Sequence, residues 1–321
     1  MPPGAASGST WRTAVAILLV VGCTAAPLLL TNEAAIYYFS LVLVWSIFAI
    51  GFDLVFGLAG MLSLGHAAFF GTGAFVYAYL AMQGGWPFAG SLLAAGLAGL
   101  LLATVFGALT LRSTGVFFAL TTQALAQLVY VLAATRLSPW TGGLDGLAGV
   151  PRPHIGSWDS FNPRVYYSVL AVLFLVALGV AALLRASPFG QVLRAIRQNT
   201  TRSLQLGFNV WRFKLAIFAV SGFYSAVAGG LLASLTSFIS PQIMQWSVSG
   251  DLLIMDLLGG AGTLLGPVLG VAFIELLREE LSAFTDHWFG VLGLIFVLCT
   301  IFLPRGLAGL IERLSPEREP T

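Results

Sequence analysis

The chain has 321 residues, of which 58% are hydrophobic and 9% are charged, and its mean hydropathy is +0.92. Soluble domains carry about 25% charged residues, so this composition excludes an ordinary soluble protein and indicates one that crosses a membrane several times. The net charge is only +2, and the cations cluster at the ends of apolar runs, which argues against nucleic-acid binding. Cys23 and Cys299 lie inside apolar runs without metal-binding or redox spacing, so we interpret both as packing residues.

The N-terminal residues 1–13 are small and polar, with Arg12 as their only charge, and an uncharged run from Ala14 to Leu30 follows. A cation ahead of such a run predicts a cytoplasmic N-terminus. A secretory signal is the alternative, because the run is short and Val21-Gly22-Cys23 resembles a lipoprotein cleavage box. We favour a retained first span, since further spans follow at once.

Between Ala34 and Leu184 the apolar runs predict five more spans. Asp53 is the only charged residue from Ala34 to Leu111. At about 20 residues per crossing, the runs place the spans at 35–56, 60–82, 88–110, 114–135 and 165–184. The Gly- and Pro-rich residues 136–164 then form a long outer loop.

Residues 185–214, which we call the basic island, carry six cations and no acid. Short loops rich in Lys and Arg stay on the cytoplasmic side, so the basic island sets the orientation of all the spans. Pro188 and Gly207 suit the start and the end of a short helix lying on the membrane face. A loop that only sets the orientation of the spans would not need apolar residues among its charges. These apolar residues could fill a groove on a partner: Ile196, Leu204, Leu206, Phe208 and Trp211.

The stretch after the basic island predicts a broken helix. Residues 215–236 cross outward, and residues 251–277 are interrupted at Gly259–Thr263 and again at Gly266-Pro267, which predicts two limbs around an unwound turn. A last span at 287–303 gives about ten crossings in an all-α polytopic membrane protein with both termini cytoplasmic. The predicted division is a cytoplasmic segment 1–13, a transmembrane domain 14–304 and a cytoplasmic tail 305–321.

Two glycine-rich stretches are candidates for the wall of a transport path. The sequence LAGMLSLGH near residue 60 resembles GAGTLLGPV near residue 263, and transporters often contain paired broken helices in corresponding halves. Unwound segments expose backbone groups that need protein or water partners. The candidate path residues in or beside these stretches are Asp53, Gly60, Ser63, His66, Asp256, Gly259, Gly260 and Thr263.

The titratable candidates have structural alternatives. A carboxylate at the centre of a membrane helix costs about 2.5 to 3.5 kcal/mol, and such residues are often functional. Asp53 and Asp256 could each hydrogen-bond amides freed at a helix break or face the route of a substrate. His66 could equally pack against neighbouring helices, and its distance in sequence from His154 and His287 argues against a metal site.

Seven blocks of sequence together resemble one family. In the same order as in LivM-type permeases, the membrane subunits of branched-chain amino-acid ABC importers, the chain has FDLVFGLAG with SLGHAAFFGTGAF, GVFFALTTQALAQ, TGGLDGLAGVP, SPFGQVLRAIRQN, LGFNVWRFKLAIF, GGAGTLLGPVLG and PRGLAGL. The resemblance covers roughly residues 35–310. It implies a bacterial inner-membrane importer with a periplasmic binding protein, a second, LivH-type permease subunit and two ATPase subunits.

In this family the basic island matches the cytoplasmic coupling helix that docks into the ATPase. The coupling residues implied by the match are Arg194, Ile196, Arg197, Leu206 and Gly207. The chain departs from the family pattern at Gln198, Thr200 and Ser203, where acidic residues are common, and also at Met61 and Asp53, where Gln and Asn are frequent.

No ATP hydrolysis is expected on this chain. The only lysine, Lys214, has no glycine-rich phosphate loop before it. We therefore expect a non-catalytic permease subunit without a cofactor or metal of its own, with ATP and Mg on the partner ATPases, in contact with lipid and not with nucleic acid. The expected cargo is a branched-chain amino acid. The alternatives are urea or a short amide, or a stand-alone carrier or channel; an intramembrane enzyme lacks paired catalytic residues.

Overall fold

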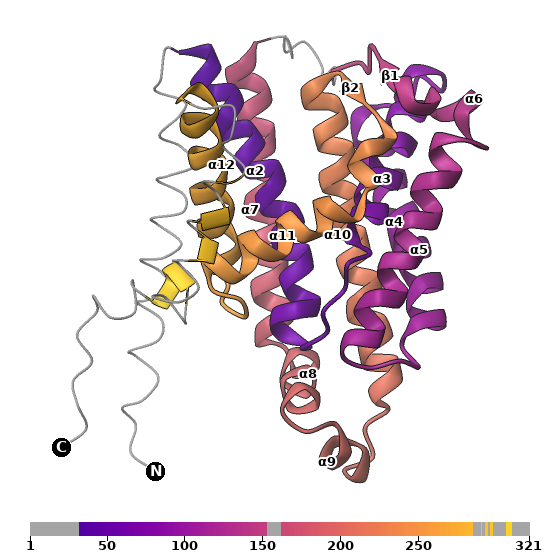
Figure 1. The fold of residues 1–321 in the computed structure, drawn as a ribbon, viewed down its shortest axis with the longest axis vertical. Helices are drawn as coiled ribbons and strands as arrows, with labels where there is room; N and C mark the ends of the chain where they lie inside the picture. Colours follow the sequence, from indigo (N-terminus) through magenta and orange to yellow (C-terminus); the bar gives the residue numbers. More distant parts are fainter. Residues whose placement is uncertain are drawn as a thin grey trace, which may run out of the picture.

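In a computed structural model of the chain, the described residues are 32–152, 162–284, and short pieces between 290 and 309. Figure 1 shows a bundle of long helices, with short helices projecting from one end and a small two-stranded sheet at the other. The predicted N-terminal segment, first span and most of the last span and tail lie outside the described residues. Their predicted boundaries stay predictions.

The described helices confirm an all-α membrane protein. The bundle contains α2 (Glu33–Asp53) with a π-helical turn, η2 (Leu54–Leu58), followed by α3 (His66–Met82), α4 (Phe88–Thr110), α5 (Val116–Ala134), α7 (Pro163–Ala186) and α10 (Val210–Thr236). Five of these segments are long and apolar enough to cross a membrane: Glu33–Leu58, α4, α5, α7 and α10. The count of ten crossings and the placement of the termini stay predictions.

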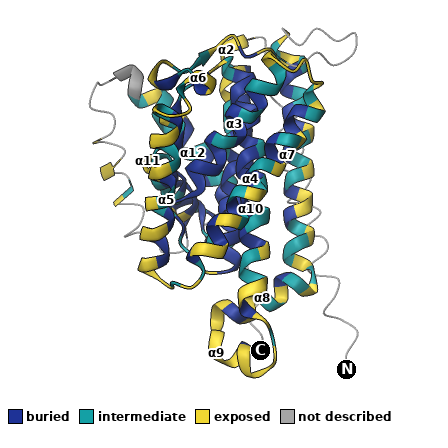
Figure 2. Cartoon of the chain, turned by 90° about the vertical axis from the view of Figure 1, so that its right-hand side faces the viewer, coloured by how far each residue is buried: buried dark blue, intermediate teal, exposed yellow. Residues whose placement is uncertain are grey.

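Helix α10 lies at the centre of the bundle, packed against α2, α3 and α4 (Figure 1). Glycines allow this close packing, because a Cβ at Gly99 or Gly222 would collide with the facing helix, and a Cβ at Gly229 would meet the backbone of Phe70. Figure 2 shows the buried residues concentrated on these central helices and exposed residues on the outer faces of α4, α5 and α7. Small residues at these contacts therefore let the central helices approach one another closely.

The end of the bundle opposite the basic island contains short elements that the sequence did not predict. Residues 136–152 form α6 (Ser138–Thr141), a 3-10 turn η3 (Gly143–Asp145) and β1 (Leu147–Ala148), which pairs antiparallel with β2 (Phe238–Ile239). A second 3-10 turn, η4 (Pro241–Met244), then leads the chain back against α3, where Met244 occupies the space beside Gly71. The outer turn expected at Ser240 thus re-enters the bundle.

The basic island forms two short helices and not the single helix that the sequence predicted. These are α8 (Pro188–Gln198) and α9 (Thr200–Gln205), and α10 already begins at Val210. Side-chain caps divide the segment, since Ser187 accepts from the amide of Gly190 at 3.2 Å and Asn199 from that of Arg202 at 2.9 Å. We call the end of the bundle formed by α8 and α9 the basic end.

The predicted broken helix is α11 (Trp246–Gly259) and α12 (Gly266–Phe284), joined by an unwound turn at residues 260–265. Helix α11 begins earlier than expected and crosses the bundle obliquely towards the basic end, where α12 turns back beside α2 (Figure 1). We call residues 59–65 the first break and residues 260–265 the second break. The first break shortens the predicted span at 60–82, because the chain stays unwound until His66.

Candidate functional site

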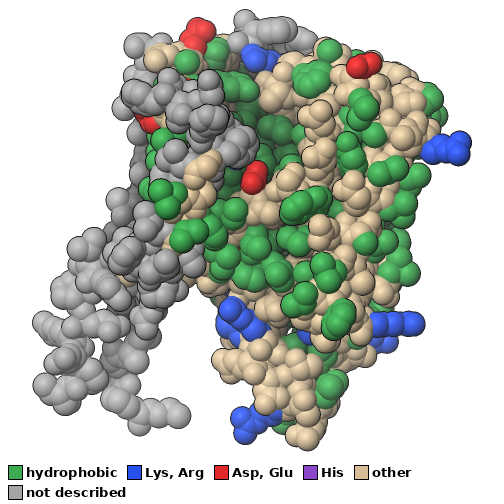
Figure 3. All heavy atoms as spheres, viewed as in Figure 1, with side chains coloured by type: hydrophobic (Ala, Val, Ile, Leu, Met, Phe, Trp, Pro, Cys, Tyr) green, Lys and Arg blue, Asp and Glu red, His purple; other side chains and the backbone are tan. Residues whose placement is uncertain are grey.

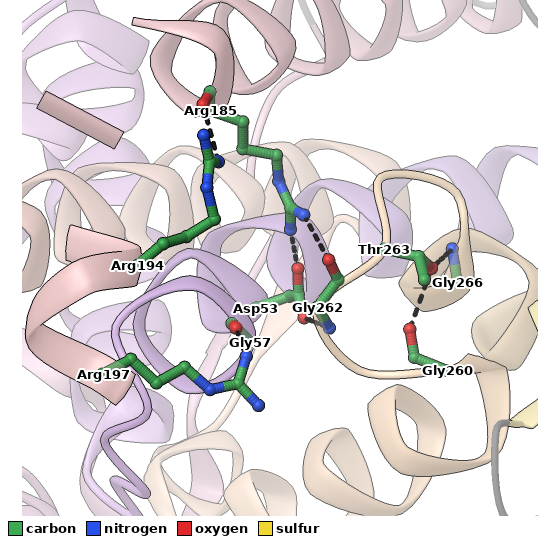
Figure 4. Close-up of polar contacts among 9 residues, drawn as sticks. All are labelled: Asp53, Gly57, Arg185, Arg194, Arg197, Gly260, Gly262, Thr263 and Gly266. Carbon is green, nitrogen blue, oxygen red and sulfur yellow. Dashed lines mark hydrogen bonds and ion pairs between the residues drawn. The ribbon is translucent and has the colours of Figure 1, made fainter. Parts of the chain in front are cut away.

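At the basic end of the bundle the second break contacts Asp53 and Gly57, which lie just ahead of the first break (Figure 4). The amide of Gly262 in the second break donates a hydrogen bond to Oδ1 of Asp53 at 2.6 Å. The side chain of Asp53 is 0% exposed. A Cβ at Gly57 would lie on the Asp53 carboxylate and 2.5 Å from the Gly262 nitrogen, so glycine is required at this contact. Asp53 therefore uses the first of the two roles predicted for it and binds an amide freed at a helix break.

Arg185 completes this contact from the last turn of α7. One guanidinium nitrogen forms an ion pair with Asp53, and the other donates to the carbonyl oxygen of Gly262 at 2.9 Å. The Arg185 and Asp53 side chains are 13% and 0% exposed, so the pair is buried. The Asp53–Arg185 pair holds both the amide and the carbonyl of Gly262, and removing either charge would leave the other buried and uncompensated.

Helix α8 reaches the same place through two arginines. Arg194 donates to the carbonyl of Arg185 at 2.8 Å, and Arg197 donates to the carbonyl of Gly57 (Figure 4). Gly60 has a φ of +70°, and a Cβ there would lie 2.7 Å from Cγ of Arg197. A Cβ at Gly262 would lie 3.3 Å from the Arg197 guanidinium. Arg197 thus lies between the glycines of both breaks.

The other predicted coupling residues divide between the interior and the tip. Ile196 is 0% exposed and anchors α8, whereas Leu206 is 70% exposed after α9. Gly207 has a φ of +87° and open space around it. Figure 3 shows basic side chains at this end, beyond the mainly hydrophobic surface of the bundle. The tip therefore offers apolar and basic groups to a partner, while Arg197 points towards the breaks and Arg194 towards the end of α7.

The second break is closed mostly by its own residues. Thr263 donates through its hydroxyl to the carbonyl of Gly260 at 2.8 Å and accepts from the amide of Gly266 at 2.9 Å. Gly259 permits close contact with the first turns of α12, because a Cβ there would meet the backbone of Gly266 and Gly270. Gly260 has a φ of +114°. Three of the predicted path residues, Gly259, Gly260 and Thr263, therefore shape this turn.

The first break is held by other helices. The amide of Leu64 donates to the hydroxyl of Thr122 at 3.2 Å, and the amide of Ala67 donates to that of Ser249 at 2.9 Å. Ser63 is buried and accepts from the amide of Gly65 at 3.2 Å. Ser63 therefore makes a local hydrogen bond within the first break.

His66 is also buried, at 0% exposure. Its Nε2 lies 2.7 Å from the hydroxyl of Ser221, and edge-to-face contacts join its ring to Phe52, Phe69 and Phe218. The structure thus shows His66 packed against neighbouring helices, which was one of the two roles predicted for it. Whether the path residues line the route stays a prediction.

Asp256 differs from the other candidates. It lies in the last turn of α11 at 0% exposure, and neither carboxylate oxygen has a hydrogen-bond partner in the part of the chain that the structure describes. Its charge interacts with that of Arg185. Sequence reasoning named Asp256 but missed Arg185, although a cation ending an apolar run could have been matched to the buried acids.

One cavity borders the first break, and another lies at the opposite end of the bundle. One, of about 280 Å³, lies between the first break and the start of α5 and is lined by Met61, Ser113 and Lys214 among others. The other, of about 350 Å³, lies at the opposite end beside Glu33, Arg152 and Tyr166. Among the described residues no group of three His, Cys, Asp or Glu side chains could hold a metal ion.

Comparison with known proteins places this arrangement in a family. Residues 34–301 match the family described as the permease component of the branched-chain amino acid transport system. The chain is 27% identical to the high-affinity branched-chain amino acid transport permease LivM of Escherichia coli, over 94% of this chain and 76% of that protein. It is 24% identical to LivH of the same organism, over 83% of this chain and 91% of that protein.

A third relative extends the range of cargo. The autoinducer 2 import permease LsrC of an Enterobacter strain is 33% identical over 45% of this chain and 43% of that protein. No significant match exists among solved structures. With the family match covering most of its length, the chain belongs to the permease components of branched-chain amino acid transport systems.

Proposed function

We propose that this chain is the LivM-type permease subunit of an ABC importer that carries branched-chain amino acids from a periplasmic binding protein across the bacterial inner membrane into the cytoplasm. The observation that carries the proposal is the contact of α8 with both breaks. Arg197 ties α8 to Gly57, just ahead of the first break, and lies beside Gly262 of the second break, while Arg194 ties α8 to the backbone of Arg185 at the end of α7. The names of the LivM and LivH relatives support the cargo and the pairing of two different permeases.

In this proposal the basic end faces the cytoplasm, both termini lie on that side and the chain crosses the membrane about ten times. Two ATPase subunits bind ATP and Mg, and dock on the tip around Leu206 and Gly207. A second, LivH-type subunit completes the route, and this chain holds no cofactor. Docking displaces α8, and the arginine contacts transmit that displacement to the breaks, which have discrete alternative arrangements.

The route itself is proposed to run beside the two breaks. The path residues Gly60, Thr263 and their neighbours would form its wall at the cytoplasmic side. The structure gives these glycines backbone conformations and contacts that a larger residue would disturb. In this proposal, a conformational change at the breaks alters the width of the route.

The test of coupling is a bulky substitution at the tip. In vesicles containing both permeases, both ATPases and the binding protein, Gly207→Trp should abolish ATP-driven leucine uptake while membrane insertion stays normal. The strain of a side chain at φ +87° and the added bulk both act on the docking surface. Gly179→Trp is the matched control, because it adds the same bulk on α7 where nothing lies within 4 Å. Normal ATP-driven uptake by Gly207→Trp would refute the proposed coupling.

The cargo needs a separate measurement. Affinities of the binding protein for leucine, isoleucine, valine, urea and short amides should favour the branched-chain amino acids. Tight binding of urea or an amide alone would assign the chain to a different cargo. Gradient-driven leucine flux through the purified chain without partners would show that the chain is a stand-alone carrier and not a subunit of an importer.

A further inference from the structure

The carboxylate of Asp256 lies in an unfavourable environment. It is fully buried, and no donor in the described ranges, 32–152 and 162–284 with the pieces beyond, hydrogen-bonds to either oxygen. It also lies in the last turn of α11, where the helix dipole disfavours negative charge. A buried charge that is not paired destabilises the state in which it is found. Among the described residues, only the charge of Arg185 offsets the burial of this carboxylate.

Arg185 has an unused donor that could serve this carboxylate. Its two terminal nitrogens bind Asp53 and Gly262, whereas its Nε is buried and has no partner within the described residues. The charge of Arg185 also favours the charged form of Asp256. One buried guanidinium thus interacts with two buried carboxylates and is bonded to one of them.

We propose that Asp256 is the second docking position for Arg185, so that the guanidinium moves from Asp53 to Asp256 when the importer changes state. This inference rests on the proposed function, since it assigns the step by which motion of α8 reaches the breaks. Asp256 acts in it as a positioning residue for Arg185.

Helix α8 is placed to drive the exchange. Arg185 is separated from the start of α8 only by Ala186 and the cap residue Ser187, and its carbonyl accepts the hydrogen bond from Arg194. A shift of α8 therefore re-aims the Arg185 side chain directly. When the guanidinium leaves Asp53, the carbonyl of Gly262 loses its donor and the contact of the second break with α2 loosens. Asp53 would keep its hydrogen bond from the amide of Gly262, so the exchange replaces the ion pair with Asp53 by one with Asp256.

The experiment compares Asp256→Asn with the wild type in vesicles holding the complete importer. Leucine uptake should fall about tenfold, within the range of coupling between linked sites, while ATP hydrolysis continues, so that more ATP is used per leucine. The thermal unfolding midpoint of the purified complex should stay the same or rise, because an unpaired buried charge has been removed. Asp256→Glu, which keeps the charge, should recover part of the uptake.

The control is Asp251→Asn, which removes a charge from the same helix. Asp251 is 43% exposed and lies 3.6 Å from Arg278, away from the Asp53–Arg185 pair, so uptake should stay at the wild-type rate. Wild-type uptake by Asp256→Asn would overturn the inference. So would a fall in both uptake and unfolding midpoint without recovery by Asp256→Glu, which would make Asp256 structural. Failure of the proposed function differs from both, because the wild-type complex itself would then show no ATP-driven uptake.

Discussion

The two breaks are alike in backbone and different in their acids. Each contains a glycine in the left-handed region, Gly60 with a φ of +70° and Gly262 with a φ of +86°. In each, a hydroxyl accepts a hydrogen bond from an amide at the start of the next helix, that of Gly65 just before α3 and that of Gly266 at the first residue of α12. Each follows a helix that ends near a buried aspartate, but Asp53 is paired with Arg185, whereas Asp256 has no hydrogen-bond partner within the described part of the chain. The shared backbone features accompany the similarity in sequence between LAGMLSLGH and GAGTLLGPV. The difference between the two aspartates distinguishes an anchored first break from a second break that can switch.

The partners of each break explain the difference. Side chains of α5 and α11, Thr122 and Ser249, bind amides of the first break and of the start of α3, so neighbouring helices fix that segment. The second break relies on Thr263 internally and on Asp53 and Arg185 for its contact with α2 and α7. A segment held by one ion pair can be released by moving one side chain. We infer that the second break moves and that the first serves as its support.

The largest expected effect comes from removing the cation of the buried pair. Arg185→Met leaves Asp53 charged and buried, and should lower the free energy of unfolding by about 3–5 kcal/mol. Thermal unfolding of the purified complex in detergent measures the loss. Asp53→Asn combined with Arg185→Met removes both charges and should recover most of it. An unchanged unfolding midpoint for Arg185→Met would contradict a buried, stabilising contact between the breaks.

Much of the fold was predictable because hydropathy and turn residues act locally. Residues 88–110 were predicted as a span and form α4 with the same bounds, since the run is uninterrupted and ends at polar residues. The start predicted for the span at 215–236 was wrong, because α10 already begins at Val210. Asn209 caps this helix by accepting a hydrogen bond from the amide of Arg212 at 3.2 Å, and the helix continues through charged residues. The two-residue strands depend on pairing between distant segments, which a single-sequence pattern does not reveal.

The site was predictable only as a set of unusual residues. Glycine clusters and acids in apolar runs drew attention to Asp53, Asp256 and both breaks. Their partners come from distant parts of the chain, since Asp53 binds Gly262 and Arg197 binds Gly57. Nothing local distinguishes the paired acid from the unpaired one. That distinction depends on which carboxylate the Arg185 side chain reaches once α7 is packed.

A smaller effect is expected from the left-handed glycine of the anchored break. Gly60→Ala should cost about 1–2 kcal/mol of stability, because an L-residue at this φ brings its Cβ against the following carbonyl. Its Cβ would also press on Arg197, so uptake should fall as well. Gly179→Ala is the control, because its Cβ meets nothing within 4 Å, and alanine in a helix interior is favoured over glycine. Equal unfolding midpoints for the two variants would show that position 60 does not require glycine.

The smallest effects should separate the two breaks by function. Thr263→Val keeps the shape of the side chain but removes its bonds to Gly260 and Gly266, and Ser63→Ala removes the bond to the amide of Gly65. Each lost hydrogen bond is worth about 0.5–1.5 kcal/mol, so both variants should show modest decreases in unfolding midpoint. If the second break is the moving one, Thr263→Val should reduce leucine uptake further than its loss of stability explains, whereas Ser63→Ala should reduce stability alone. The reason is that transport depends on a hydrogen bond beyond its effect on stability only where the segment changes conformation. Uptake and unfolding midpoint are measured on both variants. If Ser63→Ala, and not Thr263→Val, reduced uptake further than its loss of stability explains, the first break would be the moving one.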